Sequence, residues 1–227
     1  MAQHADDRVA VIATDGFEEA ELTEPVKALR AAGLKVDIIA PHSGKIQGYK
    51  HHEKSITVEV GRTLDQANPD DYIAVVLPGG ALNADALRMN TEAQAFLRAM
   101  DDIHKPMAVI CHAPWELVSA GLAHGRTMTS WPTLQDDIRN AGGQWVDREV
   151  VVDDNLITSR KPDDLPAFNR ELIQRLTKQH SSVAAGDLPA GDTAGGRVAA
   201  SERAEATRRA DDTQRHPRQH TGPTARG

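Results

Sequence analysis

Short apolar runs alternate with amphipathic segments along most of the chain. Four runs bounded by polar turns are typical of buried parallel strands, and they cover residues 9–13, 36–40, 72–77 and 106–110. Between these runs, apolar side chains recur every three or four residues, which predicts helices. The alternation predicts an α/β fold: a single-domain sandwich with a mainly parallel sheet flanked by helices.

Start and stop signals place the helices. Thr23, Glu24 and Pro25 are typical of a helix start, and Gly33 is typical of its end. Further helices are expected around residues 93–100, 114–120, 134–140 and 165–179. Alternating apolar positions in 44–60 predict a β excursion, and 127–157 mixes short strands with a helix.

Composition narrows the class of protein. The 227 residues carry a formal net charge of −7, which argues against binding a nucleic-acid scaffold through phosphate neutralisation. No apolar run is long enough to span a membrane. Residues 1–8 are polar and lack the apolar core of a signal peptide, so a cytoplasmic protein is expected.

The last part of the chain differs in composition from the rest. Residues 181–227 contain no Phe, Tyr or Trp, and their apolar side chains are mostly Ala. Such a segment buries too little apolar surface to offset the entropy of ordering it. We therefore expect one domain at residues 8–180, followed by a disordered tail at 181–227.

Several common sites are absent from the sequence. Cys111 is the single cysteine, so an intrachain disulfide and a cysteine-based zinc site are excluded. No GxGxxG, GxxxxGK[ST] or HExxH motif is present. His51, His52 and Glu53 are adjacent, and on a strand they would point to opposite faces, so we interpret them as polar side chains on the surface that share no ion. Neither a metal nor a cofactor is expected.

Cys111 lies where the run 106–110 meets a predicted helix start at Pro114. This arrangement is typical of a nucleophile elbow at the carboxyl edge of a sheet. The free N–H groups of a helix start favour a thiolate and can stabilise an oxyanion. A buried structural cysteine is the alternative interpretation.

Two other strand ends carry candidate chemistry. Gly79 and Gly80 directly follow a strand, and their N–H groups could join that of His112 in an oxyanion hole. An acidic run at 18–21 also follows a strand. A protonated carboxyl there would donate a hydrogen bond to the sulfur, whereas an ionised one would raise the thiol pKa. A solvated acidic helix start is the plainer interpretation.

Seven stretches in order resemble the family of PfpI-type intracellular proteases and protein deglycases, part of the superfamily of the parkinsonism-associated deglycase. They are residues 15–22, 77–80, 108–114, 140–142, 150–153, 156–160 and 162–168. The resemblance covers residues 8–179 and implies a flavodoxin-like, class I glutamine amidotransferase-like fold.

The resemblance also implies roles for individual residues. Cys111 would be the nucleophile, His112 its partner and Glu21 the acid that hydrogen-bonds the thiol. Asp85 would reach the histidine of a neighbouring subunit in a homo-oligomer, a dimer or a hexamer. Trp131 stands where the archetypal protease has tyrosine, so a hydroxyl is lost; it would line the pocket, or serve in the core or an interface.

The resemblance predicts a cysteine hydrolase. Its substrate would be a small carbonyl compound such as methylglyoxal, a glycated protein, or a peptide. The sequence does not choose between deglycase and peptidase, although residues 162–168 favour the deglycase. A stress-response chaperone or a cysteine redox sensor is the alternative function.

Overall fold

A computed structural model describes residues 7–184 of the chain, with side chains to residue 178. Its centre is a seven-stranded sheet in the order β11-β12-β8-β7-β1-β3-β6, parallel except for β11 against β12. The strands are β1 (Arg8–Ile12), β3 (Lys35–Ala40), β6 (Arg62–Thr63), β7 (Ala74–Leu77), β8 (Met107–Ile110), β11 (Val150–Asp153) and β12 (Leu156–Ser159).

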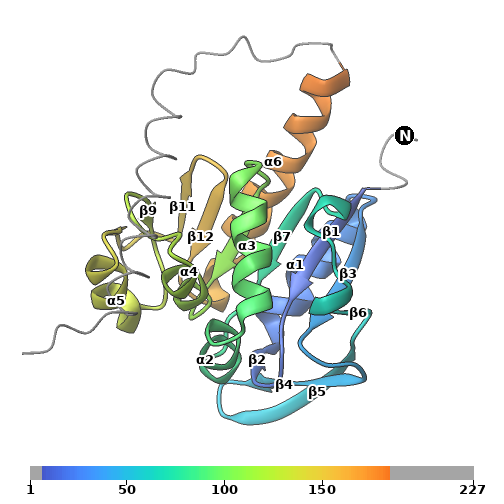
Figure 1. The fold of residues 1–227 in the computed structure, drawn as a ribbon, viewed down its shortest axis with the longest axis horizontal. Helices are drawn as coiled ribbons and strands as arrows, with labels where there is room; N and C mark the ends of the chain where they lie inside the picture. Colours follow the sequence, from blue (N-terminus) through green and yellow to red (C-terminus); the bar gives the residue numbers. More distant parts are fainter. Residues whose placement is uncertain (1–6, 185–227) are drawn as a thin grey trace, which may run out of the picture. The chain divides into compact units, whose positions relative to one another are not determined.

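Helices cover both faces of this sheet (Figure 1). On one face lie α1 (Glu19–Ala31) and α6 (Leu165–Ala184), and on the other lie α3 (Thr91–Asp102) and α4 (Pro114–Ala120). The shorter helices α2 (Ala81–Arg88) and α5 (Gln135–Asn140) pack beside α4. Single turns of 3-10 helix complete the connections at Leu64–Gln66, Pro69–Asp71, Pro132–Leu134 and Pro162–Asp164.

Two small sheets lie outside the central one. In the first, β2 (Phe17–Glu18) pairs with β4 (Lys45–Lys50), which forms an antiparallel hairpin with β5 (Glu53–Glu59). In the second, β9 (Thr127–Met128) pairs with β10 (Gln144–Trp145). The hairpin confirms the β excursion that the alternating pattern predicted.

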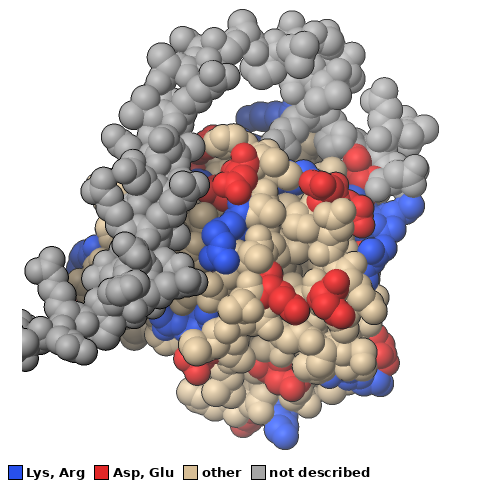
Figure 2. All heavy atoms as spheres, in the orientation of Figure 1, with Lys and Arg blue, Asp and Glu red and all other residues tan. Residues whose placement is uncertain are grey.

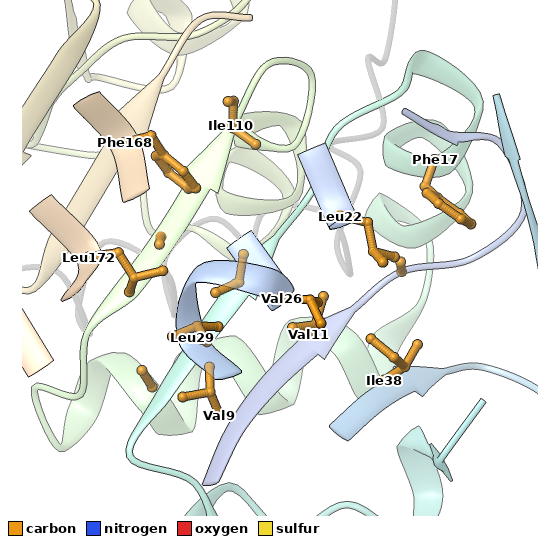
Figure 3. Packing of buried hydrophobic residues seen from close by; sticks show 14 of the residues in the cluster. Val9, Val11, Phe17, Leu22, Val26, Leu29, Ile38, Ile110, Phe168 and Leu172 are labelled. Carbon is orange, nitrogen blue, oxygen red and sulfur yellow. The ribbon is translucent and has the colours of Figure 1, made fainter. Parts of the chain in front are cut away.

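The core follows the alternation of side chains along the buried strands. Val9 and Val11 face α1 and α6, whereas Ala10 and Ile12 face α3 and α4. Figure 3 shows the first of these two layers, where Leu29 of α1 and Leu172 of α6 pack over the strands. Because both faces are buried at the centre of the sheet, β7 and β8 are apolar throughout. The predicted α/β sandwich is confirmed.

The helices differ from the predictions in three respects. The first helix begins at Glu19, not at Thr23, and Pro25 lies inside it. The hydroxyl of Thr23 donates to the carbonyl of Glu19 instead of capping a helix start. Helix α2 was not predicted, and α6 runs to Ala184, beyond the predicted helix end at residue 179. The predicted tail beyond residue 184, like residues 1–6, lies outside the described residues.

The structure can be compared with two expectations from the sequence, the absence of a membrane span and the absence of a nucleic-acid-binding surface. Among the residues that the structure describes, no helix has the length and apolar character needed to cross a membrane. On the described part of the face in Figure 2, acidic and basic side chains are interspersed rather than gathered by sign. This face therefore offers no broad basic area of the kind that binds nucleic-acid phosphates.

The strand order also places the site. The chain moves from β1 to β3 on one side and then to β7 on the other side of β1. Ligands of open α/β sheets bind outside the carboxyl ends of the strands at such a switch point. The loops that follow β1, β7 and β8 meet there, and they carry Asp15, Gly79 and Cys111.

Helix α4 contains a buried acid that bears on stability. Glu116 is 1% exposed, and neither of its carboxyl oxygens has a hydrogen-bond partner among the described residues. Burial raises its pKa well above 4.5. Glu116 therefore keeps its proton in the folded state, whereas the unfolded chain releases it above about pH 4.5. The contribution of Glu116 to the free energy of unfolding is therefore fully present below that pH, and it is lost as the pH rises towards the pKa of the folded state.

We predict that Glu116→Gln, which cannot ionise, makes the protein more stable than the wild type at pH 8 by about 1–3 kcal/mol. At pH 5 the two proteins should differ much less. Thermal unfolding at both pH values measures this, and Glu92→Gln, on the exposed first turn of α3, controls for loss of a charge. An equal difference at pH 5 and pH 8 would contradict a protonated Glu116.

Candidate active site

A cavity of about 730 Å³ opens at the carboxyl edge of the sheet, a size that suits a small ligand or a modified side chain. Cys111 and His112 lie in its wall, together with Glu21. The other lining residues are Gly16, Glu18, Tyr49, His51, His52, Gly80, Ala81, Leu82, Trp131 and Pro162.

Cys111 occupies the elbow that the sequence predicted. It directly follows β8, and its φ of 64° lies in the left-handed region that residues with a side chain rarely adopt. Its N–H donates to the carbonyl of Ser159 at 3.0 Å, and its carbonyl accepts from the N–H of Trp131 at 2.7 Å. Neighbouring segments thus hold the strained turn from both sides.

His112 reaches the sulfur although it is the next residue in the chain. Its Nδ1 lies 3.2 Å from Sγ of Cys111, a hydrogen-bonding distance for a sulfur atom. Burial lowers the pKa of His112, so at neutral pH the imidazole is uncharged and able to accept a proton. Trp131 stacks on the imidazole with ring centroids 5.6 Å apart, and Trp115 lies at 5.8 Å on a tilt.

The loop after β7 places Glu21 against the cysteine. The N–H of Gly79 donates to Oε2 of Glu21 at 2.8 Å, so this N–H is engaged and does not face the cavity as an oxyanion donor. A Cβ at Gly79 would lie 2.6 Å from that oxygen and 2.7 Å from Cβ of Cys111. The position therefore requires glycine. The N–H groups of Gly80 and His112 face the sulfur instead.

Burial sets the protonation of the acid. Glu21 is fully buried, and desolvation raises its pKa to about 8, against the opposing effects of the nearby Cys111 side chain and the N–H of Gly79. At neutral pH Glu21 is therefore a neutral acid that can donate a hydrogen bond to sulfur.

The thiol itself departs from the prediction. Burial, and next the charge that Glu21 would carry, raise the pKa of Cys111, while the N–H groups of Gly80 and His112 lower it. The sequence suggested the opposite direction from the adjacent helix start alone, and burial outweighs that effect. A protonated Glu21 removes the repulsive contribution, so the two groups depend on each other.

Asn83 is a contributor that the sequence analysis missed. Its Oδ1 accepts from the N–H of Thr14 at 2.7 Å, and its Nδ2 donates to the carbonyls of Pro78 and Gly79 at 2.9 and 3.2 Å. It thereby ties the loop after β1 to the loop after β7. A polar residue on the buried side of a helix was the available signal, but helix α2 itself was not predicted.

Three residues that the sequence analysis singled out, His51, His52 and Asp85, lie outside the group formed by Cys111, His112 and Glu21. His51 and His52 are not on a strand: they form the turn between β4 and β5, and both line the cavity. Asp85 is exposed on α2, and no contact joins it to His112 within the described chain. Across residues 7–184, no group of three or more His, Cys, Asp or Glu side chains could hold a metal ion.

Comparison with known proteins agrees with this geometry. Residues 7–175 match the DJ-1/PfpI family. Deglycase TK1284 of Thermococcus kodakarensis is 42% identical over 169 residues, 74% of this chain and 99% of that protein. Protein/nucleic acid deglycase 2 of Escherichia coli is 41% identical over 170 residues, 74% of this chain and 97% of that protein.

The solved structures agree as well. Drosophila melanogaster DJ-1beta superimposes with a TM-score of 0.70 at 29% identity. The match covers 80% of this chain and 97% of the DJ-1beta chain. The resemblance inferred from seven sequence stretches is thus confirmed over nearly the whole described fold, and the chain belongs to the DJ-1/PfpI family.

Proposed function

We propose that this protein is a cysteine hydrolase that acts as a deglycase, removing methylglyoxal adducts from amines and thiols. The observation that carries the proposal is the contact of three groups in one cavity wall. A strained Cys111 lies 3.2 Å from a neutral His112, and the buried Glu21 lies close enough to the thiol that each group shifts the pKa of the other. The two relatives named above are deglycases by name and support this branch.

The reaction begins when Sγ of Cys111 bonds to the aldehyde-derived carbon and His112 takes the thiol proton. With free methylglyoxal the product is a hemithioacetal; with an adduct, the amine or thiol leaves from that carbon with a proton. The N–H groups of Gly80 and His112 stabilise the oxyanion.

The second half of the reaction is redox-neutral overall. A proton leaves the hemithioacetal carbon and another is added at the neighbouring carbonyl carbon, which leaves a lactoyl thioester on Cys111. His112 carries these protons because its ring lies beside the sulfur. Water then cleaves the thioester, giving lactate and the free thiol.

Wild-type protein is expected to release lactate from methylglyoxal and from adducts of free amino acids. Cys111→Ser should lower this rate at least about 100-fold, because a serine hydroxyl is a far weaker nucleophile at this site. Lactate assay measures the rates, with unmodified casein as the peptidase substrate and client aggregation as the chaperone assay. Casein cleavage without lactate would assign a peptidase. Aggregation suppressed equally by Cys111→Ser, again without lactate, would assign a chaperone.

The pKa of Glu21 predicts a pH profile. Glu21 donates to the sulfur only when protonated, so activity should fall as the pH rises through about 8. Glu21→Gln keeps an acceptor for the N–H of Gly79 and a permanent N–H donor for sulfur. We expect this variant to retain activity and to lose the fall near pH 8 in kcat/KM. A fall that stays in place in the variant would show that another group causes it.

The family resemblance also suggests that the active unit is a homo-oligomer, in which Asp85 of one subunit orients His112 of the next. Its exposed place on α2 supports this arrangement, since the side chain is available to a second copy. Asp85→Ala alone and Cys111→Ser alone should each be nearly inactive. Mixed under exchange conditions, they should recover about a quarter of wild-type activity, because random pairing makes about one site in four intact. No recovery from subunits proven to exchange would contradict a shared site.

A further inference from the structure

The charges that line the cavity are of one sign. Among the lining residues that the structure describes there are two acids, Glu18 and Glu21, and neither Lys nor Arg. Glu21 is neutral at pH 7 because its pKa is raised to about 8. Glu18 therefore supplies the permanent charge of the lining, and it lies close enough to Glu21 to raise the pKa of that acid.

Glu18 is held rigidly by its main chain and by one of its two carboxyl oxygens. Its N–H donates to the carbonyl of Gly79 at 3.2 Å, and β2 pairs it with Tyr49 of β4. Its Oε2 accepts from the N–H of His51 at 3.0 Å. In the described part of the chain, Oε1 makes no hydrogen bond. A fixed carboxylate with an open oxygen is a ready acceptor for a cation.

The two lysines that stand next to lining residues in the sequence are each paired with another acid. Lys50 pairs with Glu19 at 3.3 Å, and Lys161 pairs with Asp163 at 2.9 Å. Neither lysine lines the cavity. The apolar walls formed by Tyr49, Leu82 and Trp131 suit the aliphatic stem of a long side chain. Carboxylate and apolar wall together match an arginine side chain better than a phosphate-bearing group.

We propose that Glu18 is the specificity-determining residue of this cavity and selects adducts carried on a guanidinium group over uncharged and phosphate-bearing adducts. This inference rests on the proposed deglycase activity and names the substrate class of the same site. Glu18 acts by binding the cation next to the reacting carbon, and it takes no part in proton transfer. The binding is electrostatic, so the preference weakens as the salt concentration rises.

The decisive variant is Glu18→Gln, which removes the charge but keeps an oxygen that accepts from His51. The substrates are the methylglyoxal adducts of Nα-acetylarginine amide, which is cationic, and of N-acetylcysteine amide, which is uncharged. We expect kcat/KM for the arginine adduct to fall about 10-fold, chiefly through KM, and that for the cysteine adduct to change less than about 2-fold. Glu53→Gln, which removes an exposed carboxyl on the β4–β5 hairpin outside the cavity, should change neither value.

Inhibition gives a second, independent readout. Nα-acetylarginine amide should inhibit wild type more strongly than its uncharged isostere Nα-acetylcitrulline amide, and Glu18→Gln should abolish the difference. Equal losses on both adducts, or an arginine preference that survives in Glu18→Gln, would overturn the role of Glu18. Wild type that converts neither adduct would instead overturn the deglycase proposal, so the two failures are distinguishable.

Discussion

The backbone of Cys111 is the constraint around which the cavity is built. Its left-handed conformation turns the chain sharply after β8 and brings two consecutive side chains, those of Cys111 and His112, into contact. Such a conformation costs free energy and persists where surrounding structure fixes it. Here the fixing groups are main-chain atoms of Ser159 and Trp131, which come from two different segments. The reactive pair therefore depends on the packing of the central sheet rather than on any local sequence preference.

Burial then determines the chemistry of the carboxyl and thiol groups. A carboxyl beside a thiol would repel a thiolate if it were ionised, yet Glu21 lies where water cannot stabilise its charge. The acid stays neutral, so the repulsion is removed and the carboxyl is able to donate a hydrogen bond to sulfur. The N–H of Gly79 holds the acid at this point, and a side chain at Gly79 would occupy the same space.

The sequence revealed those parts of the site that depend on local order. An apolar strand followed by Cys111, and glycines directly after another strand, are local signals and were found. Helix α2 was not predicted because Asn83, a polar residue, occupies one of its buried positions and interrupts the apolar periodicity. The place of His51 and His52 in the cavity wall was not predicted because these residues lie in a hairpin turn and not on a strand. The direction of the thiol pKa required knowledge of burial, which no local pattern contains.

Asn83 has a consequence for how the pocket can change. Its side chain joins the loops after β1 and β7 across the switch point of the sheet and holds them together. The β4–β5 turn meets the cavity from another sheet, and Glu18 is its hydrogen-bonded link to the start of α1. The catalytic floor and the recognition rim are thus supplied by different sheets. Changes in the length or sequence of this turn can remodel the rim while the nucleophile keeps its place.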